Sequence, residues 1–192
     1  MHKIVFATNN VHKMAEVSDI LCSEIKLLSL KDIGCFEELP ETQNTIEANA
    51  LQKARYVYEK FGLDCFADDT GLEVEILNGA PGVYSARYAG EDCISENNIQ
   101  KLLLELDGET NRNACFKTVA ALILDGNEYL FNGRINGKIL AEKHGSDGFG
   151  YDSIFLPDGY DQSFAQMGMD LKNKISHRAL AMKSLSNYLN QR

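Results

Sequence analysis

A buried strand turns directly into a helix in the stretch Ile4-Val5-Phe6-Ala7-Thr8-Asn9-Asn10-Val11-His12-Lys13. The apolar run Ile4 to Ala7 is typical of a buried strand, and apolar residues recur at helical spacing over residues 12–22. A strand followed at once by a helix is the beginning of an α/β sheet. The polar turn between them is the first candidate for a binding site.

The rest of the chain alternates strand-like and helix-like segments. A second helix is predicted over residues 44–61, capped by Asn44 or Thr45. A hairpin around Asp125-Gly126-Asn127 favours a mixed sheet over an all-parallel one. The remaining predicted elements are a short strand Cys65–Ala67 ending in Asp68-Asp69-Thr70-Gly71, a second strand over 72–77, a loop over 79–84, helices over 95–106 and 177–189, strands over 114–124 and 128–135, and a glycine-rich segment over 143–153.

Length, charge and cysteine usage exclude several classes of protein. The 192 residues predict one domain or two intimate lobes. A net charge of −9 disfavours non-specific binding to nucleic acid or to an anionic membrane. No apolar run approaches the roughly 20 residues of a membrane span, and the N-terminal run is too short for a signal peptide. Five widely spaced cysteines indicate reduced thiols, so we expect a cytoplasmic protein.

The turn Thr8 to Lys13 has the chemistry of a phosphate site. It lies where a strand ends and a helix begins, and a helix N-terminus offers unpaired N–H groups and a positive dipole end. The Thr8 hydroxyl and the Asn10 amide can donate to phosphate oxygens, and Lys13 adds a charge. The Walker glycine pattern is absent. The alternative is a helix cap beside a solvated lysine.

Two adjacent carboxylates, Asp68 and Asp69, follow a predicted strand. Their repulsion is costly unless a cation is near, and Mg²⁺ is a common partner because it prefers hard oxygen ligands. One of the two could also orient or deprotonate water. Glu41 and Glu47 are candidate additional ligands. The alternative is a polar turn in which Gly71 supplies a positive φ.

Two later segments could contact a planar anionic ligand. In Gly148-Phe149-Gly150-Tyr151-Asp152 the aromatic Phe149 stands between glycines, so its ring face is available for stacking. The alternative is a buried aromatic that anchors a loop. The segment Lys172 to Arg178 gathers basic residues before the last helix, with Ser176 as a cap. That cluster could equally be a solvated surface.

These segments together resemble the inosine triphosphate pyrophosphatase family, whose members act on non-canonical purine nucleoside triphosphates. The resemblance runs almost end to end and rests on five segments in family order. They are Ala7 to Lys13, Ala67 to Leu72, Gly79 to Tyr88, Gly148 to Asp152 and Ile175 to Arg178. Each segment alone is a weak signal, and the ordered set is specific.

The resemblance implies a fold and an activity. The fold would be a single α/β domain over residues 1–192, with a long curved mixed sheet flanked by helices and two lobes around a central cleft. The activity would be Mg²⁺-dependent hydrolysis of ITP, dITP and XTP to the monophosphate and pyrophosphate. Its purpose would be to remove deaminated purines from the nucleotide pool. The family is typically homodimeric.

The resemblance also implies roles for residues of this chain. Asp69 would be the catalytic carboxylate and a Mg²⁺ ligand, supported by Asp68, with Glu41 as a second ligand and Thr70 on the substrate. The triphosphate would be bound by Thr8, Asn9, Asn10, Val11, His12 and Lys13, with Lys53 and Lys172. The base would be stacked on Phe149, lined by Gly150, Tyr151 and Asp152, and read at its edge by His177 and Arg178.

The departures from the family pattern are small. Asn9 stands where glycine is frequent, Tyr151 where some members have tryptophan, and Thr70 where some have serine. Two competing interpretations stay open. One is a house-cleaning pyrophosphatase for other modified or pyrimidine triphosphates. The other is a catalytically silent binding module, which the intact Asp68, Asp69 and Lys13 disfavour.

Overall fold

The computed structural model describes residues 2–21 and 25–191. In this part of the chain seven strands form one sheet in the order β2-β1-β3-β5-β6-β7, with β4 paired to β3. The strands are β1 His2–Phe6, β2 Ile25–Leu28, β3 Cys65–Val74, β4 Pro81–Gly82, β5 Asn113–Leu124, β6 Asn127–Ile139 and β7 Phe155–Pro157. The helices are α1 Val11–Ile20, α2 Ile46–Phe61, α3 Ser95–Glu105, α4 Gly168–Ile175 and α5 His177–Leu189.

The sheet is mixed, as predicted. Strand β1 pairs in parallel with both β2 and β3, whereas β4 is antiparallel to β3 and β7 is antiparallel to β6. The chain divides into two compact units. The first unit comprises Met1–Asp69, Thr118–Gly133 and Arg178–Arg192, and the second comprises Thr70–Lys117 and Arg134–His177.

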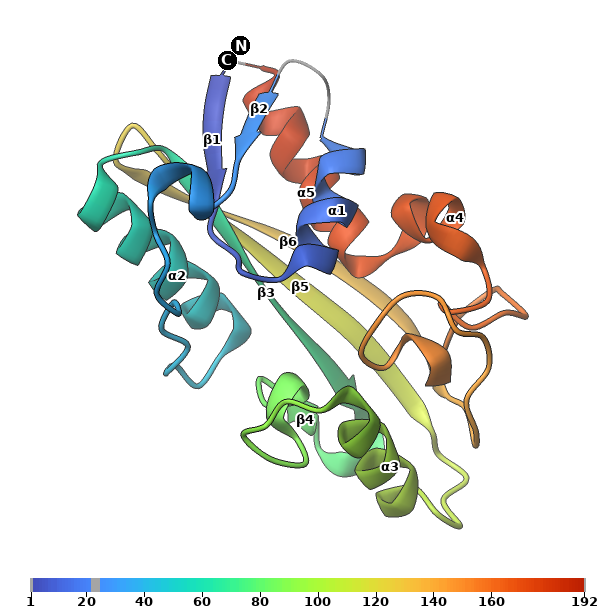
Figure 1. The fold of residues 1–192 in the computed structure, drawn as a ribbon. Coiled ribbons are helices and arrows are strands. Elements are labelled where there is room, and N and C mark those ends of the chain that lie inside the picture. The colour runs from blue at the N-terminus through green and yellow to red at the C-terminus, as the bar shows by residue number, and fades with distance from the viewer. Residues whose placement is uncertain (1, 22–24, 192) are drawn as a thin grey trace. The chain divides into compact units, whose positions relative to one another are not determined.

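In the first unit, helices cover both faces of the sheet, as Figure 1 shows for α2 on one side and α1 and α5 on the other. Successive strand residues point to opposite faces. Val5 and Ala7 therefore belong to the core that contains the apolar stripe of α2, while Ile4 and Phe6 belong to the core of α1 and α5. The rings of Phe6 and Phe66 stack in that second core, with centroids 4.6 Å apart.

In the second unit, the described residues form one apolar core on one face of the sheet. Leu72 and Val74 of β3 and Phe116 of β5 share this core with Ile99 and Leu102 of α3. The segment around Ile154, Phe155 and Phe164 completes it. Alternate residues of these strands, among them Glu73, Asn113 and Cys115, line a cavity instead.

Strand β3 contradicts the sequence prediction at the most important place. We expected a short strand at 65–67 that ends in Asp68 to Gly71 and a second strand over 72–77, with a polar turn at Asp68 to Gly71 as the alternative. The structure has one uninterrupted strand, Cys65–Val74, followed by a 3₁₀ turn at Glu75–Leu77. The turn alternative rested on aspartate and glycine, which strands usually lack. Here the aspartates are held inside the strand by cations from the flanking helices.

The other predicted elements fare better. The last helix spans residues 177–189 as predicted, Thr45 caps α2, and the β5–β6 hairpin turns at Asp125 and Gly126. The predicted end of the first helix at Cys22 lies outside the described residues. Strands β2 and β7 and helix α4 were not predicted, and the expected loop at 79–84 contains the short strand β4.

The cap of α2 gives a prediction about stability. The Thr45 hydroxyl accepts a hydrogen bond from Ala48 N at 3.1 Å. We expect Thr45→Ala to lower the free energy of unfolding by about 1 kcal/mol, which for a chain of this size shifts Tm by about 2–4 °C. Thermal denaturation measures the shift. Thr45→Ser keeps the hydroxyl and is the control; an equal loss in both variants would show that the cap bond contributes nothing.

Candidate functional site

Asp68 is the centre of a buried charge network in the first unit. Its carboxylate accepts a hydrogen bond from Lys13 Nζ at 3.0 Å through one oxygen and from Arg178 Nε at 3.1 Å through the other. Its backbone carbonyl accepts a bond from Lys53 Nζ at 2.7 Å. Burial alone would raise the pKa of Asp68, but Lys13 and Arg178 outweigh it and hold that pKa well below its ordinary value. Asp68 therefore stays ionised.

Glu16 completes this network, and the sequence analysis missed it. Its carboxylate accepts a hydrogen bond from Arg178 Nη1, and both side chains are 3% exposed. Two carboxylates thus share Arg178, and Lys13 adds a second cation beside Asp68. The only local signal in the sequence was an acidic residue three positions after Lys13, on the same side of α1.

Asp69 points to the other face of β3 and has a different environment. Lys53 Nζ lies 3.5 Å from Asp69 Oδ1 and donates to Glu41 Oε1 at 2.5 Å. Burial raises the pKa of Asp69 above its ordinary value, although Lys53 opposes this. The same two carboxylates raise the pKa of Lys53 in spite of its burial. Asp69 is therefore the more weakly stabilised of the two neighbouring anions.

The predicted metal ligands, Asp69 and Glu41, fit a hard cation. Both carboxylates converge on the single ammonium of Lys53, so they are close neighbours. Among the described residues no group of three or more potential ligand side chains gathers. Mg²⁺ does not need one, because it usually keeps several waters and takes one or two carboxylates together with substrate phosphates.

The turn before α1 caps this helix through the side chain of Asn10. Asn10 Oδ1 accepts from the backbone N–H groups of His12 and Lys13, and Thr8 Oγ1 accepts from Asn10 N. The proposed cap alternative is thus right about Asn10, but Lys13 is paired with Asp68 and is not a solvated lysine. Residues Thr8, Asn9, Asn10 and Val11 line a hollow of about 310 Å³.

The second unit holds the predicted base-binding segment. Asp152 Oδ2 accepts hydrogen bonds from Phe149 N at 2.9 Å and from Lys172 Nζ at 2.7 Å. The Lys172 ammonium lies 5.1 Å from the centre of the Phe149 ring, a cation–π contact. Lys172 is only 2% exposed. The structure thus places it beside the residues predicted to bind the base, and the phosphate role predicted for it stays a prediction.

Glycine is required at position 148 of this segment. Its φ is +79°, and a Cβ there would stand 2.2 Å from Asp152 Oδ2. Tyr151 is 5% exposed, and His177 stacks on Phe116 with centroids 4.4 Å apart. Gly150 and Thr70 are half-buried. A role of His177 or Arg178 at the base edge stays a prediction.

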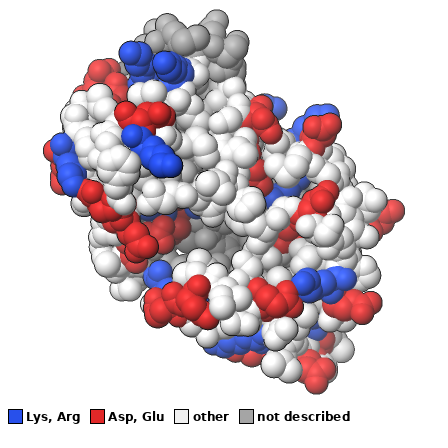
Figure 2. All heavy atoms as spheres, in the orientation of Figure 1, with Lys and Arg blue, Asp and Glu red and all other residues white. Residues whose placement is uncertain are grey.

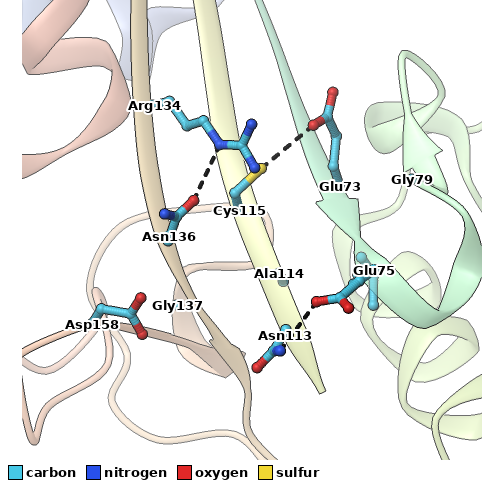
Figure 3. Close-up of a pocket in the computed structure, with 11 residues that line it drawn as sticks. Glu73, Glu75, Gly79, Asn113, Ala114, Cys115, Arg134, Asn136, Gly137 and Asp158 are labelled. Carbon is cyan, nitrogen blue, oxygen red and sulfur yellow. Dashed lines mark hydrogen bonds between the residues drawn. The ribbon is translucent and has the colours of Figure 1, made fainter. Parts of the chain in front are cut away.

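A separate cavity of about 530 Å³ lies on the polar face of the sheet in the second unit. Figure 3 shows side chains of β3, β5 and β6 around it: Cys115 Sγ faces Glu73, and Arg134 Nε donates to Asn136 Oδ1 at 3.1 Å. None of the predicted site residues lines this cavity.

The surface and the cysteines add three observations. On the face drawn in Figure 2, basic side chains are interspersed with acidic ones and form no continuous basic surface. No helix within residues 2–21 and 25–191 is long and apolar enough to cross a membrane. Cys35, Cys65, Cys93 and Cys115 are free thiols, and Cys22 lies outside the described residues.

Comparison with known sequences identifies the family. The model of the Ham1 family matches residues 4–188. A protein of Flavobacterium psychrophilum named dITP/XTP pyrophosphatase is 55% identical over 97% of this chain and 98% of its own length. One of Porphyromonas gingivalis with the same name is 52% identical over 98% of both chains. The resemblance seen in the sequence is confirmed.

A solved structure supports the same assignment. The Ham1 protein of Coxiella burnetii superimposes with a TM-score of 0.92 and 36% identity, over the full length of both chains. The α/β fold with a mixed sheet and flanking helices is therefore the fold of this family.

The buried charge network gives a second prediction about stability. Arg178→Ala removes the shared partner of two buried carboxylates, so we expect the free energy of unfolding to fall by about 3–5 kcal/mol. The control is Arg55→Ala. Arg55 pairs with Glu128 through two hydrogen bonds, but both side chains are exposed, so we expect a loss of about 0–1 kcal/mol. Urea denaturation measures both, and equal losses would contradict the buried network.

Proposed function

The chain belongs to the Ham1 family, and on this premise we propose that it hydrolyses ITP, dITP and XTP to the monophosphate and pyrophosphate. The observation that carries the proposal is that Asp68 and Asp69, neighbours in β3, point to opposite faces of the sheet. One carboxylate is fixed by Lys13 and Arg178, and the other faces Lys53 and Glu41. Two relatives named dITP/XTP pyrophosphatase support the substrate class.

The phosphate groups are bound in the first unit. The turn Thr8 to Lys13 lies at the N-terminus of α1, where the helix dipole favours negative charge, and Lys13 and Lys53 supply positive charge. Phosphoryl transfer needs mainly positioning and neutralisation of charge, because the protein has little covalent chemistry to perform. Fixed cations held by buried carboxylates provide both without reorganisation.

Asp69 and Glu41 would hold a divalent cation, which we propose to be Mg²⁺. When bound, Mg²⁺ neutralises phosphate charge and polarises the phosphoryl oxygens. Both ligands supply oxygen atoms, the donor that this ion prefers. Lys53 contacts both carboxylates and keeps them together.

Asp69 is the proposed general base. Water adds to the α-phosphorus, the bond from that phosphorus to the bridging oxygen breaks, and pyrophosphate leaves. The carboxylate of Asp69 orients the water and accepts its proton. Burial raises the pKa of Asp69, and a carboxylate with a raised pKa is a stronger base. Asp68, whose pKa is held low, keeps Lys13 and Arg178 in place.

The second unit is proposed to bind the base. Phe149 stacks on it, Gly150, Tyr151 and Asp152 line the site, and Lys172 lies beside the Phe149 ring. Thr70 contacts the substrate. A 6-oxo purine offers an acceptor where adenine offers a donor. A donor from His177 would therefore favour the 6-oxo group, and a mismatched edge at buried donors is strongly rejected.

A homodimeric state and a cytoplasmic location belong to the same proposal. They rest on the resemblance to the family and on the free thiols of the described cysteines. Gel filtration with light scattering tests the oligomeric state.

A hydrolysis panel tests the proposed activity. We expect pyrophosphate to be released from ITP, dITP and XTP in the presence of Mg²⁺, slowly or not at all from ATP, GTP, dUTP and CTP, and EDTA to stop the reaction. Release of orthophosphate would overturn cleavage between the α- and β-phosphates. Turnover of pyrimidine nucleotides would favour the alternative house-cleaning activity, and no turnover at all would favour a binding module.

The same panel tests the role of Asp69 as the general base. Asp69→Asn keeps the shape of the side chain but loses its basicity, so we expect kcat to fall by at least about 100-fold, the lower end of typical acid–base contributions. Asp125→Asn is the matched control. Asp125 is an exposed turn residue with φ +50°, which asparagine also adopts readily. Full activity of Asp69→Asn would remove Asp69 from the mechanism.

Stacking at Phe149 gives a further prediction. We expect Phe149→Ala to raise KM for dITP about 5- to 150-fold, the equivalent of the ~1–3 kcal/mol that base–aromatic stacking contributes. Phe149→Trp retains a stacking surface, so its KM should stay much closer to that of the unaltered protein. Initial rates over a range of dITP concentrations give both values. An unchanged KM in the alanine variant would place the base elsewhere.

A further inference from the structure

The segment Gly79 to Tyr88 is part of the family pattern, yet the proposed function gives it no role. Within this segment Ser85 of the second unit is 8% exposed. Ser85 Oγ accepts a hydrogen bond from Leu72 N at 2.8 Å and donates to Gly82 O at 2.6 Å. One hydroxyl therefore joins strand β3 to the β4 turn.

The backbone of Ser85 makes a third connection. Tyr151, which is 66 positions further along the chain, donates from its hydroxyl to Ser85 O at 2.9 Å, and this bond is buried. The Tyr151 ring lies in the apolar core of the second unit. Tyr151 also belongs to the segment Gly148 to Asp152, which carries the proposed base platform Phe149. The Ser85 carbonyl thus contacts the proposed base-binding segment through the Tyr151 hydroxyl.

The position of Ser85 O is fixed from the other side as well. Asn98 of α3 is 4% exposed, donates from Nδ2 to Ala86 O at 2.8 Å and accepts from Ala89 N at 2.6 Å. The turn that presents the Ser85 carbonyl is therefore held between β3 and α3. A buried acceptor on a fixed turn gives the Tyr151 hydroxyl one favoured position, because an unpaired buried hydroxyl is costly.

We propose that Ser85 is a positioning residue for the base: it fixes Tyr151, and through Tyr151 it fixes the height and tilt of the Gly148 to Asp152 segment under the purine. This inference rests on the proposed function, since it assigns Phe149 to the base. It gives the Gly79 to Tyr88 turn a task in substrate binding that needs no direct contact with the nucleotide.

Two variants act on the same series of contacts at different points: one removes the bond from Tyr151 to Ser85 O, and the other keeps that carbonyl but removes the bonds that hold its turn. Tyr151→Phe removes only the hydroxyl and keeps the buried ring. Ser85→Ala removes the hydroxyl that bonds Leu72 and Gly82. Tyr160→Phe is the matched control, because Tyr160 is an exposed tyrosine of the same unit. Loss of one neutral hydrogen bond corresponds to roughly a 2- to 12-fold change in an equilibrium constant.

Steady-state kinetics with dITP and hydrogen exchange of the backbone amides are measured for each variant. We expect KM to rise about 2- to 12-fold in Tyr151→Phe and in Ser85→Ala with kcat changed less than about 2-fold, because the base lies away from the reacting phosphates. We expect faster exchange of amides 148–152 in both variants and no change in Tyr160→Phe. The double variant should be no worse than the worse single variant, since both break one link.

Other outcomes overturn the inference. A lower Tm with KM and exchange over residues 148–152 unchanged would assign the bond to stability alone. Additive effects in the double variant would mean that the two residues act separately. If the unaltered protein hydrolyses no dITP, the proposed function fails, and the exchange measurement alone decides whether Ser85 holds the segment.

Discussion

The structure of the first unit depends on how β3 accommodates two neighbouring carboxylates inside a buried strand. Side chains alternate across a strand, so Asp68 and Asp69 point to opposite faces of the sheet and do not confront each other. Each face must then supply its own cation, because a buried carboxylate without a partner is strongly destabilising. Lys13 and Arg178 serve one face and Lys53 serves the other. This requirement fixes which sides of α1, α2 and α5 must face the sheet.

The two aspartates are stabilised unequally, and that difference separates their tasks. Asp68 meets two cations through its carboxylate, and its pKa is held low. Asp69 lies 3.5 Å from one cation that Glu41 shares, and burial raises its pKa. A fully paired carboxylate is a good structural element and a poor base. A carboxylate that is buried but weakly paired can gain a metal ion or a proton.

The sequence predicted what local patterns determine and missed what distant pairing determines. Apolar residues at helical spacing predicted α1, and cap chemistry predicted Thr45 at the start of α2. The two separate strands predicted before and after Asp68 to Gly71 are one strand, and Arg178, a partner that holds Asp68 inside it, stands 110 positions away. Glu16 was missed for the same reason, since its role depends on that arginine. Long-range charge pairs leave almost no local pattern.

In the second unit, a buried aromatic anchors the Gly148 to Asp152 segment, but it is Tyr151 and not Phe149, for which that alternative was proposed. Tyr151, at 5% exposure, is the aromatic that anchors the segment in the core, and its hydroxyl bonds Ser85 O. Phe149 is held differently, by its backbone N–H on Asp152 and by the Lys172 ammonium against its ring. Because Tyr151 supplies the apolar anchorage, Phe149 does not need to be buried to hold the loop. A segment with one anchoring ring and one half-buried ring is suited to present an aromatic surface to a planar ligand.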